Sequence, residues 1–307
     1  MASTSEIRRR IGSVRQTQKI THAMYLISQA KLRKAKADLS NTRPYFDALQ
    51  TEIGRVFNAD AAVESRYLCG ESSEDSRPRP GVAACLLITA DKGLAGAYNQ
   101  NAIRQAQQFL SANEGAALYV VGEYGRRWFA QRNIPIEKSF LYTAQNPTLR
   151  RARQISELLL ERYDAGELNA VCVIYTDMKN GLEATVRQAQ LLPLPRQHFS
   201  AAQAHTADGP VFEFVPSPDA VLNNAVRSCL TGFIYSALVD SFCSEQNARM
   251  TAMNSANQNA EKILAELNVE YNRIRQAAIT QEITEVSAGA LAQKRNRQKK
   301  QKEVCGL

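Results

Sequence analysis

The chain has 307 residues, of which 44% are hydrophobic and 22% are charged, a composition typical of a folded chain with room for two average domains. No apolar run approaches the ~18 residues of a transmembrane helix, and the start, MASTSEIRRR, lacks an apolar signal core, so we expect neither a membrane span nor secretion. The six cysteines have no paired metal-ligand spacing, which predicts reduced packing residues and no metal site.

The net charge of +8 is concentrated at the two ends of the chain. Residues 1–43 contain ten Lys or Arg against Glu6 and Asp38, and residues 294–303 contain six against Glu303. This asymmetry indicates an acidic partner surface or a polyanion at the two ends, although a solvated basic helix face would give the same pattern.

The N-terminal segment, residues 1–62, has the pattern of a long helix with one apolar or small-residue seam. Ser5 is a plausible N-cap, and Pro44 is expected to kink the helix because proline removes a backbone donor. The polar and small seam residues in its middle would let two helix backbones approach closely. The seam positions recur at alternating steps of four and three, as in a coiled coil: Ile7, Ile11, Val14, Gln18, Thr21, Tyr25, Ser28, Leu32, Ala35 and Leu39.

Residues 63–81 are polar, rich in Ser and Pro and aperiodic, so we expect an exposed linker. From residue 82 to residue 216, short apolar runs alternate with helical segments, which predicts an α/β domain with a largely parallel sheet. A turn at Lys179–Gly181 would make the fourth strand antiparallel. The predicted strands are 82–90, 117–121, 171–176, 183–192 and a short one at 211–215, and the predicted helices are 101–111, 124–131 and 148–165.

Residues 217–293 form the second long helix of the prediction. From Asp219 to Gln293 there is no proline and there are only two glycines, Gly232 and Gly289. Ser217 or Asp219 can cap its start, with Pro218 in the first turn. A helix of roughly 110 Å needs a partner helix along part of its length and an enclosing partner beyond it. The basic tail, residues 294–307, has no apolar periodicity until its last residues and is expected to be disordered.

The chain offers few candidate chemical sites. The turn DKGLAGAYN, Asp91–Asn99, lies where a dinucleotide fold places its phosphate loop, but it lacks the G-x-G-x-x-G pattern and is more simply a tight strand-to-helix turn. Asp91 and Asp177 end predicted strands and are either catalytic carboxylates or, as is commoner there, turn formers. The basic residues in 8–36 could track nucleic-acid phosphates, but the helix seam runs through the same residues.

Several motifs resemble the gamma subunits of F-type ATP synthases. At the start these are Thr17–Thr21 and Ala23–Met24, and in the middle TADKGLAGAYN. In the C-terminal half they are Ser244–Gln246, Ala248–Met250 and RQAAITQEITEVSAGA, Arg275–Ala290. The resemblance implies an antiparallel coiled coil of the N- and C-terminal helices with a central Rossmann-like α/β domain. It also implies a non-catalytic rotor without a cofactor, which couples rotation of a membrane c ring to the catalytic beta subunits.

The resemblance also implies partners and contact residues. The partners would be a hexamer of alpha and beta subunits, an epsilon subunit and the c ring, with one copy of this chain per complex, peripheral on the cytoplasmic side of a bacterial inner or plasma membrane. Alternatives are a non-rotary coiled-coil adaptor and a nucleotide-dependent enzyme. Contacts to beta subunits would map to Arg275, Gln276, Thr280, Glu282 and Met24, and contacts to the c ring or epsilon subunit to Phe212, Glu213 and Phe214.

Overall fold

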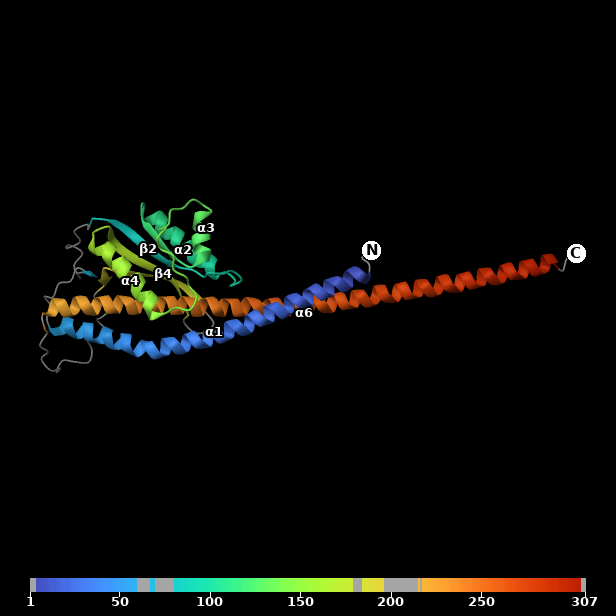
Figure 1. The fold of residues 1–307 in the computed structure, drawn as a ribbon, viewed down its shortest axis with the longest axis horizontal. Coiled ribbons are helices and arrows are strands. Elements are labelled where there is room, and N and C mark those ends of the chain that lie inside the picture. The colour runs from blue at the N-terminus through green and yellow to red at the C-terminus, as the bar shows by residue number, and fades with distance from the viewer. Residues whose placement is uncertain are drawn as a thin grey trace. The chain divides into compact units, whose positions relative to one another are not determined.

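The computed structural model describes residues 4–59, 67–69, 80–178, 184–195, 215 and 217–304. It contains two compact units, one formed by Tyr25–Ala252 and the other by Met1–Met24 with Met253–Leu307. Two helices contribute to both units: α1 (Thr4–Ala59) and α6 (Pro218–Val304), blue and orange to red in Figure 1. Each unit is described separately below.

The unit Tyr25–Ala252 is built around a four-stranded sheet in the order β3-β2-β4-β5. β2 pairs in parallel with both β3 and β4, whereas β5 is antiparallel to β4. The parallel sheet and the antiparallel fourth strand are confirmed. The strands are β2 (Val82–Ile88), β3 (Ala117–Val121), β4 (Leu168–Met178) and β5 (Ala184–Leu192).

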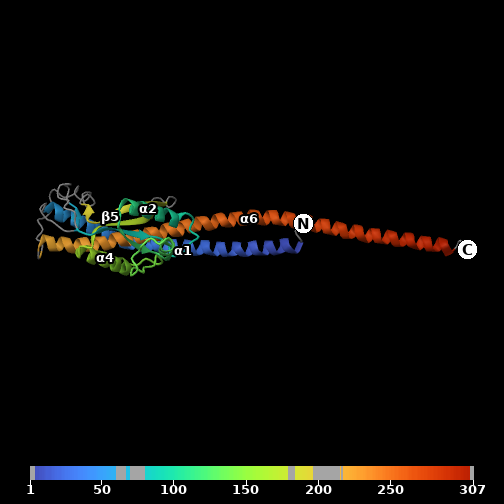
Figure 2. The ribbon, with the colours of Figure 1, turned by 90° about the horizontal axis from the view of Figure 1, so that it is seen from above.

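Both faces of this sheet are covered, which explains why β2 is a continuous apolar run rather than an alternating one. Leu87 and its neighbours on one face pack against α2 (Tyr98–Ala112) and α3 (Glu123–Ala130). Leu86 on the other face belongs to the core shared with α4 (Leu149–Asp164) and α6. Figure 2 shows α2 and α4 on opposite sides of this unit.

Hydroxyl caps begin two of the helices. Thr148 Oγ1 accepts a hydrogen bond from Arg151 N at 3.3 Å at the start of α4. Ser217 Oγ accepts one from Ala220 N at 3.3 Å, ahead of Pro218 in the first turn of α6, which confirms Ser217 as a capping residue.

α1 and α6 approach each other closely within the unit Tyr25–Ala252. Ala35 of α1 lies in the same core as Leu230 and Ile234 of α6. A Cβ atom placed on Gly232 would lie 2.1 Å from Cδ1 of Phe46, so glycine is needed where this ring crosses α6.

In the other unit, α1 and α6 pack as an antiparallel pair around Ile7, Ile11 and Leu267. Arg8 Nη2 donates to Tyr271 Oη at 2.7 Å and, further along α1, Gln18 Nε2 donates to Glu261 Oε1 at 3.4 Å, so partner numbers fall as the chain advances. All ten seam positions predicted on α1 are buried or half-buried, which confirms the coiled-coil seam.

α1 stays helical through Pro44, since its burial against α6 outweighs the loss of one backbone hydrogen bond, and the kink expected there stays a prediction. The structure differs from expectation at two places. The expected linker contains Tyr67, which is only 1% exposed, and strand β1 (Leu68–Cys69), which pairs in parallel with β6 (Leu194–Pro195). Tyr67 Oη also bonds Asp164 Oδ2 at 2.9 Å, a long-range contact invisible in sequence periodicity.

The second difference is the length of α6, which continues to Val304 instead of ending at Gln293. The residues from 294 onward are mostly Lys, Arg and Gln, which are good helix formers even without an apolar face. The strand expected at 211–215 lies outside the described residues, apart from Val215.

Candidate functional site

The C-terminal part of α6 carries four of the predicted contact residues: Arg275, Gln276, Thr280 and Glu282. All four are exposed, as is every side chain described from Arg275 to Arg297. Thr280 Oγ1 donates to Gln276 O at 2.9 Å, a bond within the helix that leaves the hydroxyl lone pairs accessible. The packed pair with α1 includes Ile274 as a half-buried member, so the exposed stretch begins directly after it.

An apolar row lies between these four residues and escaped the sequence reasoning. Ile279, Ile283 and Val286 are 44%, 62% and 73% exposed. At about 100° per residue these three positions fall on one face, with Arg275 and Glu282 on one side of it and Gln276 and Thr280 on the other. Their spacing of four and three was the available signal. An exposed apolar row with polar flanks is typical of a protein contact surface.

Met24 is not brought together with that group. It is half-buried on α1. Because Arg8 lies opposite Tyr271 and Gln18 opposite Glu261 in the antiparallel pair, Met24 lies opposite a position near Ser255. That position is roughly 30 Å along α6 from Arg275 at the rise of an ideal helix. The two predicted contacts therefore belong to different levels of the helix pair.

The remaining predicted contact residues, Phe212, Glu213 and Phe214, lie outside the described residues. The basic N-terminal helix is described. Arg9, Arg10, Arg15 and Lys19 are all exposed, so this end of α1 presents a positive surface. Such a surface attracts acidic partners mainly at low salt.

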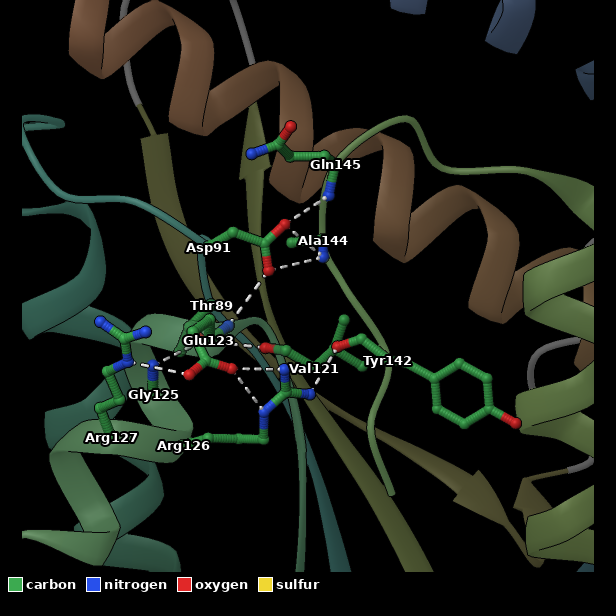
Figure 3. Close-up of polar contacts among 10 residues, drawn as sticks. All are labelled: Thr89, Asp91, Val121, Glu123, Gly125, Arg126, Arg127, Tyr142, Ala144 and Gln145. Atoms are coloured by element: carbon green, nitrogen blue, oxygen red, sulfur yellow. Dashed lines mark hydrogen bonds and ion pairs between the residues drawn. The ribbon is translucent and has the colours of Figure 1, made fainter. Parts of the chain in front are cut away.

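Asp91 is a structural residue rather than a reacting one (Figure 3). Its Oδ1 accepts from Glu123 N at 3.1 Å, and its carboxylate accepts from Ala144 N at 3.1 Å and Gln145 N at 3.0 Å. A carboxylate saturated by backbone donors from two segments fixes those segments together. The turn-former interpretation of Asp91 is therefore the one that the geometry supports.

The neighbouring carboxylates are also paired. Glu123 accepts from Arg126 Nη2 at 2.7 Å and from Arg127 Nε at 2.8 Å, and these hydrogen bonds, that of Arg126 first, lower the pKa of Glu123 (Figure 3). Asp177 forms an ion pair with Arg187 Nε at 2.8 Å. Each of these three carboxylates is already engaged by hydrogen bonds or an ion pair, so none has the open approach that a general acid or base needs.

The Asp91–Asn99 turn is closed by the protein itself. Asn99 Oδ1 accepts from Ala90 N at 2.9 Å, and Arg249 Nη2 donates to Lys92 O at 3.3 Å and Gly93 O at 3.1 Å. A phosphate loop needs converging N–H groups, whereas here an arginine meets backbone carbonyls. The geometry favours a tight turn over a nucleotide site.

Other classes of site find no support in the part of the chain that the structure describes. It holds no group of three His, Cys, Asp or Glu side chains that could bind a metal ion. Cys85, Cys172, Cys229 and Cys243 are free thiols, and burial raises the pKa of Cys243 to about 11, which makes that thiol unreactive. None of the described helices is long and apolar enough to cross a membrane.

Comparison with known proteins gives a consistent result over almost the whole chain. A family model described as ATP synthase matches residues 3–292. The chain is 41% identical to an ATP synthase gamma chain of Caldanaerobacter subterraneus, covering 93% of this chain and 98% of the relative. It is 32% identical to a sodium-ion-specific ATP synthase gamma chain of Acetobacterium woodii, covering 94% and 98%.

Solved structures share the fold. One is a chain of the Euglena gracilis mitochondrial ATP synthase (OSCP/F1/c-ring), with a TM-score of 0.64 at 15% identity, covering 94% of each chain. Another is a chain of the Tetrahymena thermophila mitochondrial ATP synthase central stalk and c ring, with a TM-score of 0.56 at 23% identity, covering 77% of this chain and 99% of the other. At these identities the likeness shows a common fold.

Proposed function

Because the chain belongs to the gamma-chain family of ATP synthases, we propose that it is the rotating shaft that couples ion flow through a membrane c ring to the catalytic beta subunits. In this role the chain makes no chemical bond itself and holds no cofactor. The observation that carries the proposal is the exposed end of α6 from Arg275 to Arg297, which extends beyond its pairing with α1. A long exposed helix with an apolar row is typical of a segment that a partner protein encloses.

The enclosing partner would be the hexamer of alpha and beta subunits. Arg275, Gln276, Thr280 and Glu282 flank the apolar row and would make its polar contacts, while Met24 would meet a beta subunit at a separate level. The exposed basic residues of α1 suit acidic loops of the beta subunits. Exposed ion pairs are worth only ~0–1 kcal/mol each, so a turning shaft can break them at every step.

At the other end, Phe212, Glu213 and Phe214 would meet the c ring or the epsilon subunit. The chain would then be peripheral on the cytoplasmic side of a bacterial inner or plasma membrane, with one copy per complex. Its coupling ion is either the proton or sodium, since the relatives include a sodium-ion-specific gamma chain.

Co-purification tests this function. A tagged chain expressed with the other subunits of its complex should be recovered with alpha and beta chains at one copy per hexamer. Recovery as a free monomer that binds nucleotide would favour an enzyme. Recovery with partners other than alpha and beta subunits would favour a coiled-coil adaptor.

A further inference from the structure

Polar side chains of α6 are buried where this helix crosses the edge of the α/β domain, within the unit Tyr25–Ala252. Ser241, Ser244, Glu245 and Arg249 are between 0% and 8% exposed. With Gln246, which is 2% exposed, five buried polar residues lie within nine positions, which is unusual on a helix that otherwise packs through apolar side chains. Their hydrogen bonds show what holds them there.

Ser241 and Ser244 both form hydrogen bonds with a single residue of β4. Ser241 Oγ accepts from the backbone N–H of Thr176 at 3.1 Å, and Ser244 Oγ donates to the backbone oxygen of Thr176 at 3.2 Å. The pairing of β4 with β2 ends at Ile174. The two serines therefore bind the backbone N–H and C=O of Thr176, which lies just beyond the last residue of β4 that pairs with β2.

Glu245 and Arg249 reach the turn after β2. Arg249 Nη1 pairs with Glu245 Oε1 at 2.6 Å on the same helix, and Arg249 Nη2 donates to the backbone oxygens of Lys92 and Gly93. The next residue, Leu94, has a positive φ of 63° and is 64% exposed. A strained residue persists only where its surroundings hold it, and Arg249 is a neighbour that does so.

We propose that Ser241, Ser244 and Arg249 form a polar clamp that fixes the rotation of α6 about its own axis against the α/β domain, and that torque passes between them through this clamp. Apolar packing resists separation but is non-directional, whereas hydrogen bonds require a set geometry. At about 100° per residue the three positions lie on one face of α6, so rotating the helix would break all their bonds together. The clamp rests on the proposed rotor function.

A purely stabilising role is the competing explanation. A buried ion pair adds little net stability compared with apolar packing of the same volume, and one buried hydrogen bond adds modestly. Stability alone is therefore a poor reason for placing these polar groups here. The two explanations differ in whether loosening the clamp changes coupling or only unfolding.

The test uses the double variant Ser241→Ala/Ser244→Ala in the whole complex and in the full chain. In the full chain, amide hydrogen exchange of Thr176 should become about tenfold faster, because its N–H loses a buried acceptor. In the complex, ATP hydrolysis should persist while ions pumped per ATP hydrolysed fall. The matched control is Thr251→Ala, since the Thr251 hydroxyl is exposed and bonds only Asn247 O within α6.

If amide exchange of Thr176 becomes faster but the number of ions pumped per ATP is unchanged, the clamp does not transmit torque and is only a stabilising contact. If the double variant does not assemble, Arg249→Lys is tested in its place. Lysine keeps the charge beside Glu245 but offers only one nitrogen to the carbonyls of Lys92 and Gly93. Unchanged ion pumping by that variant would also overturn the torque role. An unaltered chain that fails to co-purify with alpha and beta subunits would instead overturn the proposed function, while the exchange result would still report the clamp itself.

Discussion

Asp240 is a half-buried carboxylate on α6 whose pKa is raised in the folded protein. It lines a cavity of about 490 Å³ between α1, β4 and α6. Burial, and then the charge of Asp177, raises the pKa of Asp240 from an ordinary 3.8 to about 6, which Arg43, a hydrogen bond from Ser236 and Arg187 oppose. The ionised carboxylate is therefore a cost to the folded protein near neutral pH.

The pH dependence of stability follows from the sign of this shift. The pKa of Asp240 is higher in the folded than in the unfolded chain, so this group should make folding more favourable as pH falls from about 6 to about 4. Asp240→Asn should therefore stabilise the protein at pH 8 by about 1–3 kcal/mol and should have little effect at pH 4. Urea unfolding of the full chain at both pH values measures this.

Asp47→Asn is the matched control for that prediction. Asp47 lines the same cavity, but its side chain is 66% exposed and lies 3.9 Å from Arg43. Its neutralisation should change stability little at either pH, because exposed pairs contribute little. An equal effect of the two substitutions would mean that burial of Asp240 is not what matters.

At the scale of elements, two glycines of α6 should respond oppositely to the same change. Replacing an exposed helical glycine by alanine ordinarily stabilises a helix by about 0.5–1 kcal/mol, which is the expectation for Gly289→Ala, whose Cβ would meet no atom within 4 Å. Gly232→Ala should instead destabilise by about 1–3 kcal/mol, because its Cβ would overlap the Phe46 ring. Thermal unfolding of the two variants compares them directly.

A double variant identifies the cause. If the Phe46 ring is responsible, Gly232→Ala should cost less in a Phe46→Leu background than in the native chain, since the smaller side chain leaves room. An undiminished cost would place the strain in the α6 backbone rather than at the crossing of the helices.

The elements that the sequence predicts well are those whose pattern is local. The seam from Ile7 to Leu39 and the β2 run follow directly from periodicity, because their burial depends on one repeating face. Tyr67 is instead buried in a core of residues far away in the chain and donates a hydrogen bond to Asp164, and no local pattern encodes such contacts. The helical course through Pro44 likewise reflects tertiary packing that overrides a local penalty.

The candidate site divides in the same way. The exposure of Arg275 on α6 agrees with its motif on a regular helix, while its contact with a beta subunit stays a prediction. The clamp on Thr176 could not be foreseen, since Ser244 and Arg249 show as a motif but their partners on β4 and in the turn after β2 become neighbours only on folding.

At the scale of the whole molecule, the basic C-terminal extension lies beyond the region shared with the family, which ends at residue 292. Deleting residues 294–307 should therefore leave ATP hydrolysis and ion pumping by the complex unchanged, because the proposed contacts all precede the cut. Comparing both rates, and the yield of complex, with those of the full-length chain measures this. A changed rate at equal yield would assign the tail a regulatory role.

The proposed contacts between the exposed end of α6 and its enclosing partner can be tested directly by substitution. Arg275→Ala/Gln276→Ala should lower coupled ATP turnover by about threefold or more, equivalent to roughly 0.7 kcal/mol. The fold should be intact, because both side chains are exposed. Turnover of the complex and circular dichroism of the full chain measure the two effects separately.

A control on the opposite face of the same helix separates a specific grip from general weakening. Gln281 and Glu285 bond to each other at 2.9 Å and point away from the apolar row of Ile279, Ile283 and Val286. Gln281→Ala/Glu285→Ala removes a comparable number of exposed polar groups. If the partner meets α6 at the apolar row, this pair should change turnover less than Arg275→Ala/Gln276→Ala does. Equal losses of turnover would mean that the partner contacts all faces of α6 alike. The assignment of Arg275 and Gln276 as specific contacts would then be wrong, whereas the proposed rotor function would stand.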